Sequence, residues 1–206
     1  MATARRQAAA DKRRTILDAA VRVFARQGFH SCRVSDIADE AGVAYGLVYH
    51  YFDSKDEVLD TLFLERWNIM VDVIRTIDGQ DLPAREKLYS IVSFIVDSYR
   101  HEPDVMKVII VEVTRAANSF GQTHLRAIDE AYGLIAGIVS RGQREGSFNP
   151  DVSPLFAAFT FYGAIEQVLT GWIFDMLPQG ERDLEQAKHF IIETICGGLD
   201  RADSSK

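Results

Sequence analysis

The chain has 206 residues, of which 47 % are hydrophobic and 26 % are charged, a composition typical of a folded protein with ample material for a core. Its formal net charge of -7 is unevenly distributed, because residues 1–52 hold eight Lys and Arg against five acids while the rest hold 15 against 25. This asymmetry favours a nucleic-acid-binding module on an acidic body, although chance clustering would give the same charge pattern.

Several classes of function lack their sequence signatures. Cys32 and Cys196 share no metal-ligand spacing, so neither a disulfide framework nor a metal site is predicted. The five histidines fall singly, and no phosphate-binding glycine loop or nucleophile elbow is present, so we expect no enzyme, no catalytic residue and no cofactor. The start of the chain lacks the apolar segment of a signal peptide, which predicts a cytoplasmic protein. Leu155–Phe174 is apolar but contains Glu166, and a buried helix explains it better than a membrane span.

The first part of the chain predicts a basic segment followed by a helix. Residues up to about Ala10 are small and basic, and we expect them to be poorly ordered, either as an arm for DNA phosphates or as a simple tail. A first helix is predicted from Asp11 to Gln27, with Gly28 ending it.

Two short helices joined by a tight turn are predicted within Val34–Lys55. Apolar residues at the spacing of a helix precede Gly42, which tolerates the left-handed backbone of a helix end, and a second apolar face follows it. The second short helix, Tyr45–Tyr51, holds three tyrosines and a histidine, more polar aromatic groups than a buried face requires. This pattern is typical of a helix-turn-helix that enters the DNA major groove, whereas an ordinary surface hairpin of helices would share only its apolar spacing.

The rest of the chain predicts further helices and no strand. Val108–Val113 has strand propensity but would have no partner, so we predict helix there too. A capping box at Ser54 predicts the start of a long helix that runs to Ile77. Further helices are expected to begin at Pro83, at Pro103 and at Ser153 with Pro154, and another is expected over 125–146. The last expected helix runs from Asp183 to Cys196, where Gly197 and Gly198 stop it. The fold class is therefore all-α, with a helix-turn-helix DNA-binding domain over 1–52 and a larger helical domain over 53–206, to which the family resemblance given below assigns ligand binding and dimerisation.

The helix that begins at Pro154 is apolar on every side, which implies cover on more than one face. A second subunit supplies that cover most simply, so we expect a homodimer with two helices from each partner, and Phe161 and Ile191 at the seam. Glu166 is a lone acid in this helix. It either pairs inside the body, meets the dimer partner, or faces a ligand cavity.

The helix-turn-helix segment resembles the TetR family of regulators. The matching residues are Ala41-Gly42-Val43, Ala44-Tyr45-Gly46, Tyr49-His50-Tyr51-Phe52 and Lys55. The resemblance implies an all-helical homodimer on a palindromic double-stranded DNA operator, with a ligand cavity in the larger domain and a ligand-driven tilt of the fourth helix.

The resemblance also assigns the DNA contacts. Base contacts fall to Tyr45 and Gly46, with Ala44 and His50 nearby, phosphate contacts to Tyr49, Tyr51 and Lys55, and further contacts to Arg33 and Ser35. Arg33 and Leu47 depart from the family pattern, which often has hydroxyl residues at these two places, so one phosphate contact is in doubt at each.

A finer resemblance is to the branch of this family that controls fatty-acid degradation and senses long-chain acyl-CoA, through segments such as Val43-Ala44 and Gly163-Ala-Ile-Glu-Gln. It implies a small lipophilic effector, with acyl-CoA as the candidate and its nucleotide near Arg66 or Arg115. The residues expected to line the ligand space are Phe94, Tyr99, Tyr132, Tyr162 and Glu166. The same apolar composition suits a multidrug- or aromatic-sensing repressor. An enzyme acting on acyl-CoA or a drug-like compound and a membrane-surface helix protein are the rivals from other classes.

Overall fold

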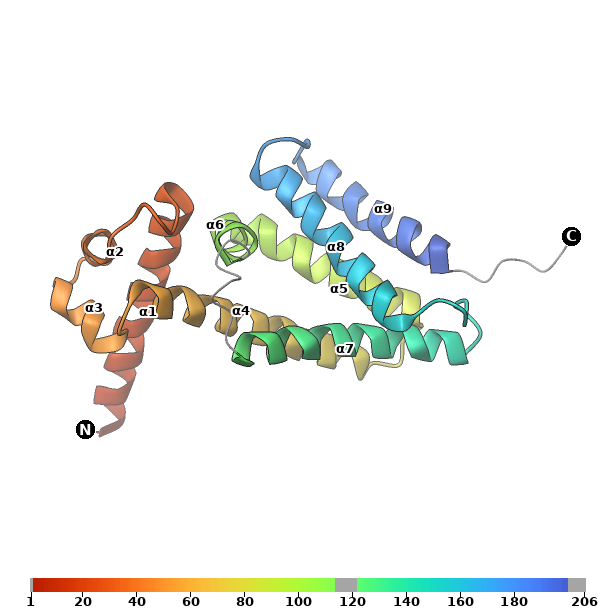
Figure 1. Ribbon diagram of the computed structural model, residues 1–206, viewed down its shortest axis with the longest axis horizontal. Helices are drawn as coiled ribbons and strands as arrows, with labels where there is room; N and C mark the ends of the chain where they lie inside the picture. Colours follow the sequence, from red (N-terminus) through yellow and green to blue (C-terminus); the bar gives the residue numbers. More distant parts are fainter. Residues whose placement is uncertain (1, 114–121, 200–206) are drawn as a thin grey trace, which may run out of the picture. The chain divides into compact units, whose positions relative to one another are not determined.

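The computed structural model describes residues 2–113 and 122–199, and every regular element in these ranges is a helix (Figure 1). The all-α prediction is thereby confirmed. The chain divides into two compact units, the first formed by residues up to Arg66 with 104–113 and the second by the other described residues. No helix among the described residues is both long and apolar enough to span a membrane.

The first unit is built on α1 (Ala2–Gln27) and the short helices α2 (Val34–Ala41) and α3 (Tyr45–Tyr51). The expectation that residues up to about Ala10 lack order was wrong, because α1 begins at Ala2. The segment is rich in alanine, lysine and arginine, which are among the strongest helix formers, and nothing in it breaks a helix before Gly28.

The core of the first unit extends beyond residue 52, the predicted end of the DNA-binding domain. The first turns of α4 (Lys55–Asp78) bury four apolar side chains, and Arg13 of α1 forms an ion pair of 2.7 Å with Glu65 of α4. The buried residues of this part of α4 are Val58, Leu59, Leu62 and Phe63. The unit therefore ends inside α4, which is one continuous helix that contributes residues to both units.

The chain returns to the first unit through α6 (Pro103–Lys107) and η1 (Val108–Val113). The predicted helix at 108–113 is present, but it has the wider turns of a π-helix. Its Val108 is buried, and η1 packs against α1. The strand propensity of this segment is thus overridden because the first unit offers it only helical neighbours among the described residues.

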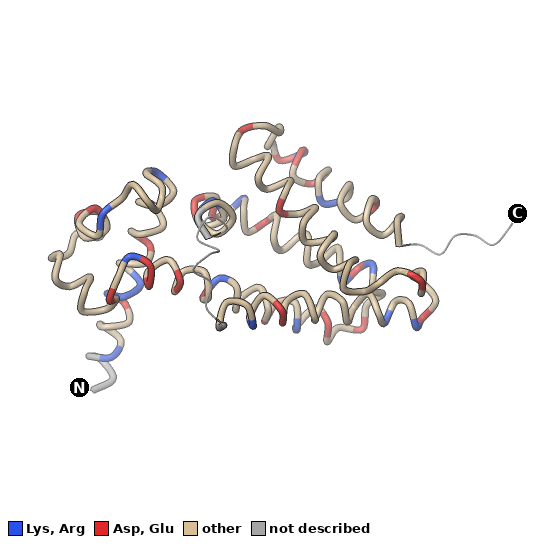
Figure 2. Tube along the Cα trace, viewed as in Figure 1, with Lys and Arg blue, Asp and Glu red and all other residues tan. Residues whose placement is uncertain are grey.

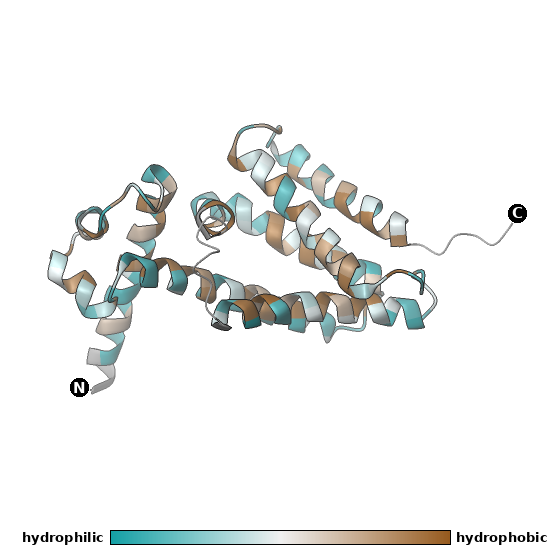
Figure 3. Cartoon of the chain, in the orientation of Figure 1, coloured by the Kyte–Doolittle hydropathy of each residue, from teal (hydrophilic) through white to brown (hydrophobic). Residues whose placement is uncertain are grey.

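The second unit contains the end of α4 with α5 (Ala84–His101), α7 (Gln122–Arg144), α8 (Pro154–Ile173) and α9 (Glu181–Leu199). α8 packs on α7, and α9 packs on both α5 and α8. Hydrophobic and hydrophilic residues alternate along α7, as expected of a helix buried on one side (Figure 3).

The ends of α8 and α9 show one confirmed signal and one that was wrong. Ser153 caps α8 as predicted, since its Oγ accepts a hydrogen bond from the Phe156 N–H, and Pro154 occupies the first turn. α9 was expected to stop at Gly197 and Gly198 but continues to Leu199. The buried Leu199 side chain holds the last turn, and the Leu199 carbonyl accepts a 2.6 Å hydrogen bond from the Asn149 N–H.

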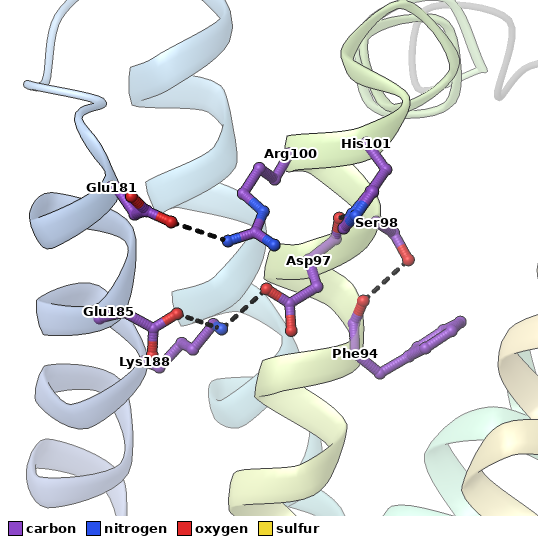
Figure 4. Close-up of polar contacts among 8 residues, drawn as sticks. All are labelled: Phe94, Asp97, Ser98, Arg100, His101, Glu181, Glu185 and Lys188. Carbon is purple, nitrogen blue, oxygen red and sulfur yellow. Dashed lines mark hydrogen bonds and ion pairs between the residues drawn. The ribbon is translucent and has the colours of Figure 1, made fainter.

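Charged contacts join α5 to α9 (Figure 4). The Lys188 ammonium is buried and donates to Asp97 at 2.8 Å and to Glu185 at 2.7 Å. Arg100 of α5 pairs with Glu181 of α9 at 3.6 Å. Lys188 fixes the register of the two helices, because its removal would leave the Asp97 and Glu185 carboxylates close together without a cation.

Candidate DNA interface and effector site

α3 presents an uncharged, exposed face. Tyr45 is 53 % and Tyr49 43 % exposed, whereas Val48 is the buried residue of this helix. The neighbouring predicted base contacts, Ala44, Gly46 and His50, are exposed as well. Lys, Arg, Asp and Glu are absent from α3 (Figure 2), so its contacts to bases would come from hydroxyl, imidazole and backbone groups.

The turn before α3 sets its direction. Gly42 has φ 63° and ψ 37°, the left-handed region in which a side chain is strained, and its N–H donates to Asp39 while the Val43 N–H donates to Ala38. Val48 on α3 and Phe52 just after it then enter the core of the unit. The predicted helix-turn-helix is therefore present, and the outward face of α3 does not pack into the core.

Tyr45 and Tyr49 form one polar aromatic pair. Their rings meet edge to face with centroids 5.2 Å apart, and the Tyr45 hydroxyl donates to the Tyr49 hydroxyl at 3.2 Å. Tyr49 accepts in this hydrogen bond, so its own hydroxyl proton is left unused within the pair. The Tyr49 proton is consequently available to a DNA phosphate, in keeping with the predicted division between a base-reading Tyr45 and a phosphate-binding Tyr49.

Lys55 has a second role that the sequence did not indicate. Its ammonium donates to the carbonyls of Phe29 at 2.5 Å and Cys32 at 2.8 Å, and lies 4.6 Å from the centroid of the Phe29 ring. Two of its three protons thus hold the connection between α1 and α2, and one proton remains for a phosphate.

The remaining predicted DNA contacts differ in exposure. Arg33 is exposed at the start of α2, where its backbone N–H donates to the Asp36 carboxylate at 2.7 Å. Ser35 and Tyr51 are half-buried. Arg33 therefore has the freedom to replace the hydroxyl that the family pattern often has at this position.

In the second unit, one face of α8 meets α7 in a cluster of aromatic rings. Phe159, Tyr162 and Glu166 are spaced by three and four residues and so share a face of α8. Tyr132 of α7 stacks on Phe159 with centroids 3.9 Å and planes 6° apart, and meets Tyr162 edge to face at 5.6 Å. Three of the five predicted ligand residues, Tyr132, Tyr162 and Glu166, are therefore brought together.

Two residues of this cluster were missing from the predicted ligand set. Trp67 of α4 meets Tyr162 with centroids 5.7 Å apart, and its indole N–H donates to the Ala127 carbonyl at 2.8 Å. The signals were available, because Trp67 follows Phe63 by one helical turn and Phe159 precedes Tyr162 by one turn. We define the ring cluster as Trp67, Tyr132, Phe159 and Tyr162.

Glu166 lies beside the ring cluster with its carboxyl group unpaired. Among the described residues, this half-buried carboxyl has neither a hydrogen bond nor an ion pair, so the alternative of a partner within the body finds no support. Burial raises its pKa above the usual range of glutamate. Burial, with a smaller effect of the Glu166 charge, also raises the pKa of Tyr132 to about 12 and that of Tyr162 further.

The other predicted ligand residues are not in this cluster. The Tyr99 ring is buried against Trp172 with centroids 5.4 Å apart, and its hydroxyl donates to Gln179 at 2.8 Å, so it anchors the connection from α8 to α9. Phe94 is half-buried, and its ring points away from α9 (Figure 4). Arg66 belongs to the first unit, and Arg115 lies outside the described residues.

The predicted seam residues face the wrong way. Phe161 is 1 % and Ile191 3 % exposed, both in the core of the second unit, so neither is available to a partner. The exposed aromatic residues of the same helices include Phe156 on α8, at 77 %, and Phe190 on α9, at 68 %, while Phe159 of the ring cluster is 51 % exposed. Because α8 is apolar all round, the sequence pattern could not tell its inward face from its outward face.

The fold and the exposed α3 define a helix-turn-helix transcription regulator rather than an enzyme. The family model described as bacterial regulatory proteins, tetR family, matches residues 16–62, and the model of a tetracyclin repressor-like C-terminal domain matches residues 85–195. The chain belongs to the TetR family, whose regulators bind operator DNA as dimers.

Relatives extend the likeness over nearly the whole chain. The fatty acid metabolism regulator protein of Bacillus subtilis is 26 % identical over 184 residues, covering 89 % of this chain and 93 % of the relative. The solved structure of the fatty acid degradation regulator FadR from Bacillus halodurans superposes with a TM-score of 0.82 at 28 % identity, covering 92 % and 97 % of the two chains. The structure of FadR from Bacillus subtilis in complex with stearoyl-CoA superposes with a TM-score of 0.80 at 25 % identity, covering 90 % of this chain and 98 % of the other.

Proposed function

We propose that this protein is a transcriptional repressor that leaves its operator when it binds a long-chain acyl-CoA. The observation that carries the proposal is the ring cluster of the second unit, an apolar site with few polar groups, in a chain similar over its length to a regulator solved with stearoyl-CoA. Aromatic walls suit a flexible acyl chain, which gains about 0.8 kcal/mol for each methylene group removed from water.

Release requires that the effector change the spacing of two recognition helices. A dimer reads half-sites one DNA turn apart, about 34–36 Å, so a change of a few ångströms prevents both copies of α3 from entering successive grooves. α4 is the covalent route for this change. It contributes Trp67 to the ring cluster and Lys55 to the anchor of the helix-turn-helix, and it is unbroken between them.

The dimer seam is assigned to the exposed face of α8 and α9. Phe156 and Phe190 are large aromatic side chains that are left in water by the single chain. Two such rings from each partner supply the buried centre that a stable two-fold interface needs. Because a repressor has to reach its operator DNA, we place the protein in the cytoplasm.

Recovery of bound genomic fragments followed by release assays tests the function. Fragments retained by the full-length dimer would give the operator, and palmitoyl-CoA added to the operator complex is expected to release it where free CoA at equal concentration does not. Release by a planar aromatic compound, with no response to any acyl-CoA, would instead identify a drug- or aromatic-sensing repressor.

A further inference from the structure

Glu166 has a carboxyl group whose placement the packing of the second unit does not explain. Its backbone carbonyl accepts a hydrogen bond from the Thr170 hydroxyl at 2.8 Å, but the described residues give its carboxyl group no partner. An acid in such a place costs stability unless something binds it, since burial of an unpaired polar group is unfavourable. This half-buried group is therefore a candidate to bind a ligand that has a matching polar atom.

The residues around Glu166 restrict the charge of that ligand. The ring cluster places aromatic carbon on one side of the site, and the hydroxyl-bearing members Tyr132 and Tyr162 lie close enough to Glu166 to feel its charge. Within the described part of the second unit, no Lys or Arg forms an ion pair or hydrogen bond with any of these three side chains. A carboxylate or phosphate would find no described cation to balance its charge here, so this position favours an uncharged acceptor over an anionic group.

Three hydrogen-bond donors of neutral character remain. Burial favours the protonated Glu166 carboxyl, which can donate, and the raised pKa values keep both tyrosine hydroxyls protonated. Donors without charge suit an acceptor without charge, such as a carbonyl oxygen. An acyl-CoA carries one such oxygen between its apolar chain and its anionic nucleotide, namely the thioester carbonyl.

We propose that the carboxyl group of Glu166, with the hydroxyls of Tyr132 and Tyr162, binds the thioester carbonyl of the effector. This assignment rests on the proposed function. It makes Glu166 a specificity residue that selects a neutral acyl ester and places the acyl chain along the aromatic rings. The anionic CoA nucleotide lies away from Glu166.

The test compares two ligands that differ only at the carbonyl. Palmitoyl-CoA and its thioether analogue S-hexadecyl-CoA have the same chain length and the same nucleotide, but the thioether has no oxygen to accept a hydrogen bond. Each is titrated into the operator complex of the full-length dimer. Wild-type protein is expected to need about threefold to tenfold more thioether than thioester for half-release, the range of one lost hydrogen bond.

Variants then assign the difference to its donors. Glu166→Leu removes the donor, and Tyr132→Phe removes a hydroxyl while keeping the ring stacked on Phe159, so both should shrink the ratio of thioether to thioester. Glu166→Gln keeps an N–H donor and should retain much of the preference for thioester over thioether. Asp151→Asn is the matched control, because it removes an exposed carboxylate from the turn before α8 and should leave the ratio unchanged.

The outcomes separate this inference from the function on which it rests. Equal release by thioester and thioether in the wild type, or a ratio that survives both Glu166→Leu and Tyr132→Phe, overturns the role of Glu166 while acyl-CoA remains the effector. Release by a long-chain alkylammonium, with no release by either CoA compound, overturns both the role of Glu166 and the acyl-CoA function, since a cation among aromatic rings would require an ionised Glu166. If Glu166→Leu does not fold, Tyr132→Phe decides.

Discussion

Lys55 is expected to serve both the fold and the DNA, and Lys55→Met separates these roles while keeping most of the apolar stem. The substitution removes the hydrogen bonds from the ammonium to the Phe29 and Cys32 carbonyls and the contact with the Phe29 ring. Hydrogen bonds from a charged donor contribute about 1.5–3 kcal/mol each, and this side chain is only half-buried, so we expect a loss of about 2 kcal/mol in the free energy of unfolding.

The same substitution should change the salt dependence of DNA binding. One phosphate contact from each subunit of the dimer corresponds to a decrease of about 1.8 in the slope of log affinity against log salt, at about 0.9 per phosphate. Urea unfolding measures the first effect, and operator binding at several salt concentrations measures the second. Lys12→Met, which removes the same charge from the exposed surface of α1, should leave the unfolding free energy unchanged.

The two expected effects of Lys55→Met, on stability and on the salt slope, can fail independently. Lost stability with an unchanged salt slope would show that Lys55 is an anchor without a phosphate contact. An unchanged unfolding free energy would show that the hydrogen bonds to Phe29 and Cys32 contribute nothing, and the structural role would have to be abandoned.

Three further predictions concern the seam, α3 and the effector site. Phe156→Glu or Phe190→Glu should give folded monomers in sedimentation, whereas Phe161→Ala should cost about 3–5 kcal/mol of unfolding free energy and leave the association state unchanged; dimers from both Glu variants would contradict the seam. Gly46→Ala should weaken operator binding without loss of stability, because an added Cβ meets nothing within 4 Å in the chain and alanine is the better helix former; unaltered affinity would exclude close approach of Gly46 to DNA. Burial raises the pKa of Glu166, so the folded state keeps this proton to higher pH than the unfolded state, in which the pKa of Glu166 is about 4.3. The unfolding free energy should therefore fall as pH rises from that value through the folded pKa, and Glu166→Gln should remove this decrease. Urea unfolding over a pH series would show or refute the effect.

Local signals in the sequence were enough to predict the helix-turn-helix. Gly42 occupies the left-handed turn that was expected of it, and α3 has the bounds predicted from its aromatic content. Such features depend on neighbours a few residues away, so a linear pattern contains them. The anchoring role of Lys55 depends on carbonyls more than twenty residues earlier in the chain, which no local spacing reveals.

Side-chain direction in the second unit was harder to predict. In α8 nearly every residue is apolar, so the choice of Phe161 over Phe156 for the seam had no support from periodicity, and packing against α7 and α9 decided it. Tyr99 was placed in the ligand space from its residue type and its helix, but its ring stacks on Trp172 and its hydroxyl donates to Gln179. Glu166 could be singled out because a lone charge in an apolar helix is visible in the sequence itself, and its role in ligand binding stays a prediction.

Titration of the operator complex with saturated acyl-CoAs of increasing chain length tests whether a long acyl chain releases this repressor. The concentration for half-release is expected to fall by about fourfold for each added methylene, equivalent to about 0.8 kcal/mol, until the site is full. The same release at every chain length, or none at any, would contradict it.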